Sequence, residues 1–338
     1  DSLDKKIVRL LNARAKLGLR IGNLKRHKGM GAYSPDRESE VLAKVRSLNK
    51  GPLSRLALEA IYREVMSSSL AIDKAPRIAY LGPEATFTQL AAIKRFGSQV
   101  EYIPCNSITD VFTEVEKGVA DYGVVPIENS IEGAVSYTLD MFVDSDLKIC
   151  AQVILYVSHN LLANCPKSEI RRVYSNPQVF GQCRIWLQEN LPAAEKIDVF
   201  STTQAAQIAG RERGGACIAS LLAAKAYNLK IVAKDIEDSP HNITRFLVIG
   251  KSDVKPTGTD RTSVIFSIKD KVGALQDMLL PFKKYRINLT KIESRPSKKK
   301  AWDYYFFVDL QGHKDSPKVK KALAELENKC RFLKVLGS

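Results

Sequence analysis

The sequence of 338 residues has no CxxC pair, only four histidines, and six cysteines scattered between Cys105 and Cys330. Structural zinc sites are built from cysteine and histidine at short spacing, so we expect no bound metal ion. Scattered cysteines also favour a reducing compartment over a disulfide framework.

Long apolar stretches are missing as well. No apolar run approaches the roughly 18 residues of a membrane span, and no charged-then-apolar leader precedes a small-residue cleavage site. We therefore expect a cytoplasmic protein that does not contact a membrane.

Acidic residues are scarce at the two ends of the chain. Residues 1–74 carry 16 basic and 8 acidic side chains and residues 256–338 carry 18 and 9, whereas the middle is nearly balanced. Basic flanks can bind nucleic acid, attract anionic substrates, or only form solvated helix faces. Charge alone does not decide between these three possibilities.

The length and the first apolar pattern indicate several domains. The chain is longer than the roughly 250–300 residues at which a single hydrophobic core stops growing. Leucine and isoleucine recur every three or four positions over residues 3–25, which predicts one long helix, interrupted by Arg14 where leucine is expected. Further helices are predicted from Ser34-Pro35 to about residue 49 and from about 52 to 73. Three helices alone bury little apolar surface, so we expect a homo-oligomer.

The pattern then changes twice. Residues 76–253 alternate short β-rich runs with helical stretches, which predicts an α/β domain. A second set of strands and helices from about 148 to 233, closed by a returning strand at 245–250, favours two lobes with a cleft between them. Residues 256–338 follow the order strand, helix, two strands, helix, strand, which predicts a small βαββαβ domain.

The first helix carries two cations that could hold an anion. Arg14 and Lys25 are eleven residues apart, about three helical turns, so they share a face with small residues between them. The alternative is an interfacial arginine paired with a glutamate of a partner chain. NARAKLGLRIGNLK, YSPDRESEVL and AIYREVMSSSLAID resemble the three helices of the all-helical chorismate mutases.

This resemblance implies that the helical domain rearranges chorismate to prephenate. The reaction is pericyclic, so the enzyme must hold a dicarboxylate in its reactive conformer and stabilise charge on the ether oxygen. Arg14 would bind a carboxylate and Lys25 the ether oxygen. The family has glutamine or glutamate where Asp73 stands, and it takes a further arginine from the partner chain. The residues that fall on substrate-binding positions are Arg14, Lys25, Arg37, Glu38, Ser69 and Asp73.

Polar side chains in the α/β domain lie where strands are expected to end. GPEATFTQLAA (82–92) and PIENSIEGAV (126–135) should each follow a strand and open a helix, and two such turns suit a ligand with carboxylates. SNPQVFGQC (175–183) and HNITRFLVIG (241–250) add polar groups to apolar segments. Capping and turn formation would explain each of these segments singly. Together, in this order, they resemble prephenate dehydratase, and TRF (244–246) is the most specific element.

The second resemblance implies conversion of prephenate to phenylpyruvate without metal or cofactor. Thr244 would polarise the leaving hydroxyl. Thr86 would contact the substrate, and Arg245 would neutralise a carboxylate of the substrate or a neighbouring acid of the lobe. The other catalytic residues implied orient the ring and carboxylates: Asn129, Ser130, Ser175 and Gln182.

In the last domain VGALQDML (272–279) is expected to open a helix and NLTKIESRP (288–296) to form the next strand. They resemble the phenylalanine-binding ACT domain, with ESRP as the most specific mark, although an edge strand ended by proline would also contain it. The resemblance implies a ferredoxin-like fold and L-phenylalanine as allosteric effector. The effector would contact Gly273, Ala274, Leu275, Asn288, Leu289, Glu293, Ser294 and Arg295.

Combined, the resemblances imply a multidomain enzyme of phenylalanine biosynthesis under feedback inhibition. Its parts would be an all-α mutase domain (1–75), a two-lobed, periplasmic-binding-protein-like α/β dehydratase domain (76–253) and a βαββαβ ACT domain (256–338). One alternative is a dehydratase whose mutase-like helices serve only for dimerisation. Another is a DNA-binding regulator, but the first helix is too long for a helix-turn-helix unit, so we expect no nucleic-acid partner. The oligomer could be a dimer or a tetramer.

Overall fold

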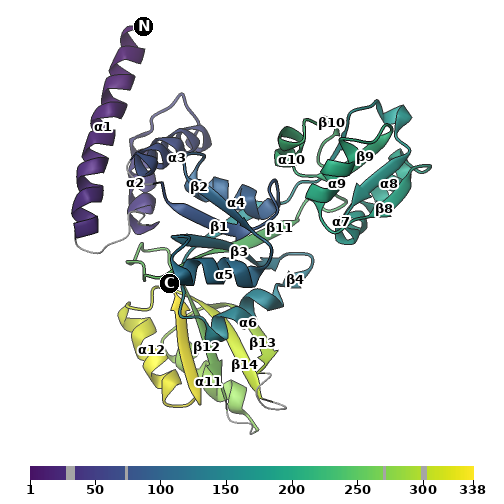
Figure 1. Ribbon diagram of the computed structural model, residues 1–338. Helices are drawn as coiled ribbons and strands as arrows, with labels where there is room; N and C mark the ends of the chain where they lie inside the picture. Colours follow the sequence, from purple (N-terminus) through teal and green to yellow (C-terminus); the bar gives the residue numbers. More distant parts are fainter. Residues whose placement is uncertain (28–34, 73–74, 269–271, 298–302) are drawn as a thin grey trace.

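A computed structural model covers residues 1–338 and describes all of them except 28–34, 73–74, 269–271 and 298–302. At residues 25 and 26 it describes the backbone only. Three helices, two α/β lobes and a smaller unit of strands and helices follow one another along the chain (Figure 1). None of the described helices is both long enough and apolar enough to span a membrane.

The N-terminal helices are α1 (Ser2–His27), α2 (Pro35–Leu48) and α3 (Arg55–Ala71). α1 is one continuous helix, as predicted, and most of it stands away from the rest of the chain (Figure 1). α3 begins later than predicted because Ser54 is its N-cap, with Oγ accepting a hydrogen bond from Ala57 N at 3.1 Å.

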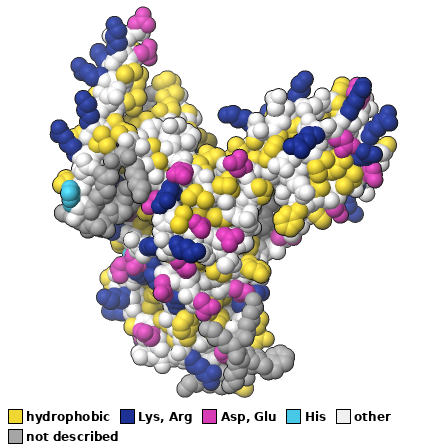
Figure 2. Space-filling model, viewed as in Figure 1, with side chains coloured by type: hydrophobic (Ala, Val, Ile, Leu, Met, Phe, Trp, Pro, Cys, Tyr) yellow, Lys and Arg dark blue, Asp and Glu magenta, His cyan; other side chains and the backbone are white. Residues whose placement is uncertain are grey.

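The apolar stripe of α1 is left uncovered in a single chain. It lies beside a row of lysine and arginine side chains (Figure 2). Such a stripe is typical of a helix that packs against another chain. Its members are each more than half exposed: Leu3, Ile7, Leu10, Leu17, Ile21 and Leu24.

The first α/β lobe is built on strands in the order β5-β11-β3-β1-β2, with β4 paired to β3. β1, β2 and β3 are parallel, and β11 is antiparallel to both β3 and β5. The elements are β1 (Arg77–Leu81), α4 (Phe87–Phe96), β2 (Glu101–Cys105), α5 (Ile108–Lys117), β3 (Tyr122–Asn129), β4 (Gly133–Ala134), α6 (Ser136–Asp144), β5 (Lys148–Tyr156) and β11 (Ile243–Gly250).

Two expectations about this lobe were wrong. The second lobe does not begin near residue 148, because β5 pairs with β11 along its whole length in the first sheet. β3 does not lead directly into a helix either. Asn129 Oδ1 accepts hydrogen bonds from the backbone N–H groups of Ile131 (2.9 Å) and Glu132 (3.0 Å), which turns the chain back into β4 before α6 begins.

The second lobe has a sheet of its own, in the order β10-β6-β9-β7-β8. The chain enters it between β5 and β6 and returns between β10 and β11, so two segments connect the lobes (Figure 1). Its elements are β6 (Asn160–Ala163), a 3₁₀ turn (Lys167–Glu169), β7 (Arg172–Ser175), α7 (Pro177–Gln182), α8 (Arg184–Asn190), β8 (Glu195–Asp198), α9 (Thr202–Ala209), β9 (Gly215–Ala219), α10 (Leu221–Ala226) and β10 (Lys230–Ala233).

The C-terminal unit has the expected order of elements, and its sheet runs β13-β14-β12-β15 with β13 at the edge. One face of the sheet packs on α11 and α12, where Phe266 and Val308 meet Phe282 and Leu326 in a buried cluster. The elements are β12 (Arg261–Ser267), α11 (Ala274–Lys284), β13 (Leu289–Pro296), β14 (Tyr304–Gln311), α12 (Pro317–Glu327) and β15 (Phe332–Gly337).

The other face of the C-terminal sheet packs on the first lobe. Ile265, Phe307 and Leu336 belong to the same buried cluster as Leu139 and Phe142 of α6. Adjacent residues of each strand therefore point into two different cores, as strand alternation requires. The C-terminal unit is joined to the lobe by a hydrophobic interface.

The two sheets also touch edge to edge. β15 pairs with β5 at Gly337 and Ile149. Gly337 has a φ of 150°, and a Cβ at this position would lie 2.2 Å from Ile149 O. Only glycine allows this approach of the two backbones.

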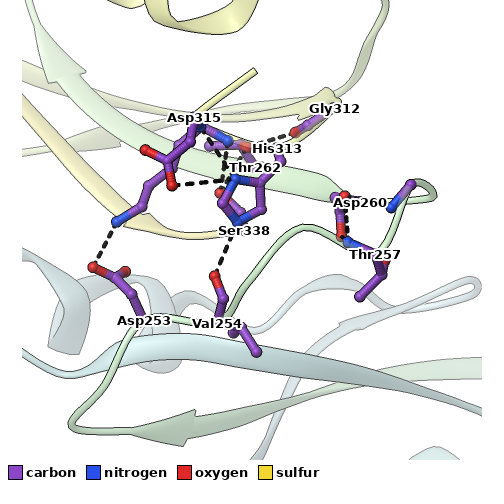
Figure 3. A network of polar contacts seen from close by, with 11 residues as sticks. Asp253, Val254, Thr257, Asp260, Thr262, Gly312, His313, Asp315 and Ser338 are labelled. Atoms are coloured by element: carbon purple, nitrogen blue, oxygen red, sulfur yellow. Dashed lines mark hydrogen bonds and ion pairs between the residues drawn. The ribbon is translucent and has the colours of Figure 1, made fainter. Parts of the chain in front are cut away.

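Residues 251–260 lead from β11 to β12 and are held by polar contacts (Figure 3). Nε2 of the buried His313 ring donates a hydrogen bond to Val254 O at 3.0 Å. Lys314 forms an ion pair of 2.5 Å with Asp253. Asp260 accepts hydrogen bonds from Thr257 and Gly258. The connecting segment is thereby fixed to the C-terminal unit.

Candidate functional site

Asn129 and Thr244 meet at the ends of two neighbouring strands. They are register partners of β3 and β11, and Asn129 Nδ2 donates a hydrogen bond to Thr244 Oγ1 at 2.8 Å. The same amide nitrogen donates to Asn242 Oδ1 at 2.9 Å. Because Asn129 Oδ1 accepts from two backbone N–H groups, the amide can present only its nitrogen to Thr244.

The hydrogen bonds continue into the second lobe. Asn242 Nδ2 donates to Gln182 Oε1 at 2.8 Å, and Gln182, on α7, donates through Nε2 to Glu132 Oε1 at 3.2 Å. The direction of each bond follows from the one before it, starting at Asn129. Side chains of both lobes and of a segment between them therefore form one ordered chain.

His159 ends this chain and lies on the other segment that connects the lobes. Its Nε2 is 2.8 Å from Gln182 Oε1, and since that oxygen can only accept, Nε2 carries the proton. Burial lowers the pKa of His159 below its usual value of 6.5, against smaller raising effects of Gln182 and Glu237. The imidazole is therefore neutral at pH 7. Its Nδ1 is buried and has no hydrogen-bond partner among the described residues.

Gln182 and Glu132 also line a cavity of about 510 Å³ that opens between the β3–β4 turn and α7. Two further carboxylates of the lining are already bound by protein donors, since Glu237 accepts from His159 N at 2.8 Å and Asp238 from Ile185 N at 3.0 Å. The full lining is Ile131, Glu132, Pro177, Gln178, Gly181, Gln182, Glu237, Asp238 and Ser239.

Three further predicted residues are engaged with the backbone. Ser130 Oγ donates to His241 O at 2.6 Å and accepts from Ile243 N at 2.9 Å, which ties the end of β3 to the start of β11. Ser175 is fully buried and donates to Ile218 O at 3.0 Å. Thr86 caps α4 and donates to Leu81 O at 3.2 Å. No hydrogen bond between described residues joins these three hydroxyls to the Asn129–Gln182 chain.

Arg245 follows Thr244 on β11 and so points to the opposite face of the sheet. Its Nε donates to Gln152 Oε1 at 2.9 Å, and its Nη1 lies 2.5 Å from Asp309 Oδ2 on β14 of the C-terminal unit. An acid of the lobe, Glu128, lies 3.7 Å from the same nitrogen, so Arg245 is paired with acids of both units. The structure does not bring its guanidinium together with the cleft residues.

The described mutase-like residues form two separate groups. Arg14 Nη1 donates to Ser69 Oγ at 2.7 Å, which joins α1 to α3. Glu38 is buried and pairs with Arg95 of α4 at 3.2 Å, whereas Arg37 is exposed and pairs with Glu40. The side chain of Lys25 and all of Asp73 lie outside the described residues.

The residues expected to hold phenylalanine lie at two ends of the C-terminal unit. β13 is parallel to β12, because both are antiparallel to β14, so Glu293 and Arg295 lie at the same end as Gly273 before α11. Leu289 is six residues from Arg295 along the strand, about 20 Å away. Within one chain, Leu289 and the residues at the Gly273 end therefore cannot contact the same phenylalanine molecule.

Gly273 and Arg295 have distinct surroundings. Gly273 has a φ of 77°, the left-handed conformation that favours glycine, and is exposed at the start of α11. Arg295 pairs with Asp140 of α6 in the first lobe at 3.3 Å. No group of three or more His, Cys, Asp or Glu suited to a metal ion occurs in the described parts of the chain.

Comparison with known families divides the chain in the same order. Residues 1–74 match the family model of chorismate mutase type II, residues 78–254 that of prephenate dehydratase, and residues 262–328 that of the ACT domain.

Several named proteins are similar to this chain over its whole length. A bifunctional chorismate mutase/prephenate dehydratase of Aquifex aeolicus is 51% identical over all of this chain and 95% of its own length. One from Pseudomonas aeruginosa is 44% identical over all of this chain and 94% of its own. A solved prephenate dehydratase of Arthrobacter aurescens in complex with L-Phe is similar with a TM-score of 0.73 and 32% identity, covering 77% of this chain and 89% of that one.

Proposed function

The chain belongs to the family of bifunctional chorismate mutase/prephenate dehydratases, and from this premise we propose how its parts divide the work. Residues 1–75 rearrange chorismate to prephenate, and residues 76–253 convert prephenate to phenylpyruvate. Residues 256–338 form an ACT domain of ferredoxin-like fold that binds L-phenylalanine as feedback inhibitor. The protein thereby serves phenylalanine biosynthesis.

The observation that carries the dehydratase assignment is the bond from Asn129 to Thr244. Prephenate loses CO2 from its quaternary ring carbon, the electron pair of that bond enters the ring, and hydroxide leaves from the opposite carbon. The leaving hydroxide takes one proton from solvent to become water, and a hydrogen-bond donor on the hydroxyl eases its departure. Because Asn129 occupies a lone pair of the Thr244 oxygen, the hydroxyl proton of Thr244 is directed to another acceptor, and the leaving hydroxyl of prephenate is that acceptor.

Gln182 and Asn242 orient the substrate from the two sides of the cleft. Their carbonyl oxygens are held by donors within the chain of hydrogen bonds. An N–H of Gln182 faces the cavity beside Glu132, and a substrate carboxylate there takes the place of Glu132 as its acceptor. Ser130, Ser175 and Thr86 hold the strand ends that form the walls of the cleft.

The mutase site needs a second copy of the chain. Arg14 and Ser69 supply one wall between α1 and α3, and the exposed apolar stripe of α1 supports packing against a partner's helices. Arg14 binds a carboxylate of chorismate, and Lys25 and Asp73, whose side chains lie outside the described residues, act on its ether oxygen. Glu38 and Arg37 complete the site at the start of α2. The enzyme is then a homo-oligomer, at least a dimer.

The effector site likewise needs two chains. Glu293 to Arg295 lie at the same end of the sheet as Gly273, Ala274 and Leu275, while Asn288 and Leu289 lie at the far end of β13, so a partner's β13 has to supply the latter pair. The open edge of β13 supports such pairing. The N–H groups at the start of α11 then bind the phenylalanine carboxylate.

One contact favours a narrower function, in which the N-terminal helices only dimerise. Glu38, a residue of the mutase set, is buried against Arg95 of the dehydratase part. Supplying either chorismate or prephenate to the purified protein separates the two functions. We expect both to be consumed with phenylpyruvate as product, whereas the narrower function leaves chorismate unchanged.

A further inference from the structure

Four charged side chains lie together between the first lobe and the C-terminal unit, here called the charge ring: Glu128, Arg245, Asp309 and Lys291. Arg261 of β12 lies near enough to interact electrostatically with the first three. Arg245 lies 2.5 Å from Asp309 and 3.7 Å from Glu128, and Lys291 lies 3.2 Å from Glu128. Lys291 and Asp309 are register partners of β13 and β14, so their side chains stand on the same face of the sheet. The side chains of Arg245, Asp309 and Lys291 are each about nine-tenths buried.

The ring adjoins the catalytic pair through two peptide bonds. Arg245 follows Thr244 on β11, and Glu128 precedes Asn129 on β3. The two strands are in register at both positions, so the Thr244–Asn129 bond on one face has the Arg245–Glu128 contact beside it on the other. The register of β3 and β11 shifts immediately after Arg245. A small movement of the charge ring therefore acts on the β3–β11 pairing at the point where its regular register ends.

The ring also adjoins the effector residues. Lys291 lies on β13 two residues before Glu293, with its side chain on the same face of the sheet, whereas the register shift between Leu289 and Lys291 leaves Leu289 packed on the helix side. β13 has a strand neighbour on one side only. Its other edge is the one expected to pair with a partner's β13, so a change in that pairing moves β13, and Lys291 ties β13 to Glu128 in the first lobe.

Burial makes the ring sensitive to such movement. A buried ion that loses its partner is strongly destabilised, so Arg245, Asp309 and Lys291 have to keep or exchange partners, whereas Glu128 is 39% exposed and is the member that can change partner most easily. Glu128 already has two cations within 4 Å, Arg245 and Lys291. If Lys291 withdraws, the nearest cation left to Glu128 is Arg245, and closing the 3.7 Å gap between them draws β3 and β11 out of their present alignment.

We propose that the charge ring transmits phenylalanine binding at β13 to the Thr244–Asn129 pair, which rests on the proposed feedback inhibition of the dehydratase. The effector displaces β13, Lys291 leaves Glu128, and Glu128 closes on Arg245. Asn129, attached to Glu128, then loses its alignment with Thr244, and the proton of Thr244 is no longer directed at the leaving hydroxyl. Arg245 and Lys291 are positioning residues and do not touch substrate or effector.

The test compares full-length protein with two variants of the ring and two controls. Lys291→Met removes the ion pair with Glu128, and Asp309→Asn weakens the link to Arg245 while Ser263 Oγ, at 2.6 Å, still donates to it. Lys291→Arg keeps the charge. Lys314→Met is the matched control, because Lys314 also joins the C-terminal unit to the preceding segment through a carboxylate, Asp253, but adjoins neither catalytic strand.

Each protein is titrated with L-phenylalanine by calorimetry, and its prephenate dehydratase rate is measured with and without saturating phenylalanine. In the wild type, Lys291→Arg and Lys314→Met, phenylalanine binds and inhibits, with a coupling in the usual range of about 5–150-fold. In Lys291→Met and Asp309→Asn phenylalanine still binds, but the ratio of the two rates falls to near one.

Inhibition of Lys291→Met and Asp309→Asn to the same extent as Lys314→Met overturns the role of the ring. If Lys291→Met alone fails to fold, Asp309→Asn decides. Failure of the wild type to bind phenylalanine, or to be inhibited by it, is a different result, because it contradicts the proposed feedback inhibition on which the ring's role depends.

Discussion

Asn129 donates an N–H of its side-chain amide to the hydroxyl oxygen of Thr244 at 2.8 Å, and the turn after β3 prevents the amide from presenting its oxygen instead. The hydroxyl proton of Thr244 is thereby available for a hydrogen bond that polarises the leaving hydroxyl. A weak acid such as threonine contributes to catalysis only when its proton faces the group that needs it. The relation between these two residues is the basis of the dehydratase mechanism.

Thr244→Ala removes the hydroxyl and should lower kcat for prephenate by roughly 10²–10⁴-fold, the usual contribution of a positioned proton donor. KM should change far less, because the interaction strengthens in the transition state. Thr244→Ser keeps the hydroxyl and should retain much of the activity. Steady-state kinetics on prephenate measures kcat and KM for both variants. Wild-type turnover by Thr244→Ala would exclude this residue from the mechanism.

His159 should make stability depend on pH. In the unfolded chain the imidazole takes up a proton near its usual pKa of 6.5, whereas burial lowers the pKa in the folded protein. As pH falls through 6.5 the unfolded chain binds the proton first, so the folded state loses stability; above 6.5 this loss is absent.

His159→Gln cannot titrate, so it serves as the reference. The melting temperatures of both proteins are measured from about pH 8 to about pH 5. The melting temperature of the wild type should fall more than that of the variant over the lower half of this pH range. Parallel curves would mean that His159 does not carry the expected shift.

Gly337→Ala should separate the C-terminal sheet from β5. The added Cβ would lie 2.2 Å from Ile149 O, so the backbones have to move apart. We expect a loss of about 2 kcal/mol or more in stability, measured by thermal unfolding. Gly258→Ala is the control, because Gly258 also has a positive φ but nothing lies within 4 Å of its added Cβ, and it should cost only about 1 kcal/mol. Equal losses would show that the φ value alone matters.

Arg14→Ala should lower the rate of chorismate consumption by roughly 10²-fold or more, as expected when a carboxylate-binding donor is removed. Conversion of added prephenate should continue, because the hydrogen bonds of Arg14 to described residues go to Val65 and Ser69 of α3, outside the dehydratase domain. Arg20→Ala, an exposed arginine on the same helix, is the control and should consume chorismate normally. A normal rate in Arg14→Ala would remove this residue from the mutase site.

Gly273→Val should weaken phenylalanine binding measured by calorimetry, because the valine side chain is strained at a φ of 77° and obstructs the start of α11. Gly258→Val carries a similar strain, at a φ of 92°, away from the expected site. It should bind phenylalanine like the wild type. Unchanged binding by Gly273→Val would place the effector elsewhere.

Local patterns predicted the local elements. The heptad-like spacing from Leu3 to Leu24 specified α1 as one helix, since neighbours one turn apart suffice to define it. The order of strands and helices in the C-terminal unit was predicted for the same reason. The place of β5 was not, because its partner β11 follows more than eighty residues later in the sequence.

The cleft residues were predicted mostly by resemblance to a family. Contacts that the sequence pattern did not predict involve residues far apart along the chain. His159 is a single histidine in an apolar segment, and no spacing reveals that it meets Gln182. The pairing of Arg245 with Asp309 joins residues 64 positions apart, and it is visible only after the strands are in register. Strand alternation alone, however, already places Arg245 on the face opposite to Thr244.

The central claim, that one chain carries out both reactions at separate sites, is tested most directly by a time course of products from chorismate. The wild type should form phenylpyruvate, Thr244→Ala should accumulate prephenate, and Arg14→Ala should leave chorismate unchanged yet convert added prephenate. Formation of phenylpyruvate by Thr244→Ala at the wild-type rate, or failure of the wild type to consume chorismate, would contradict the account.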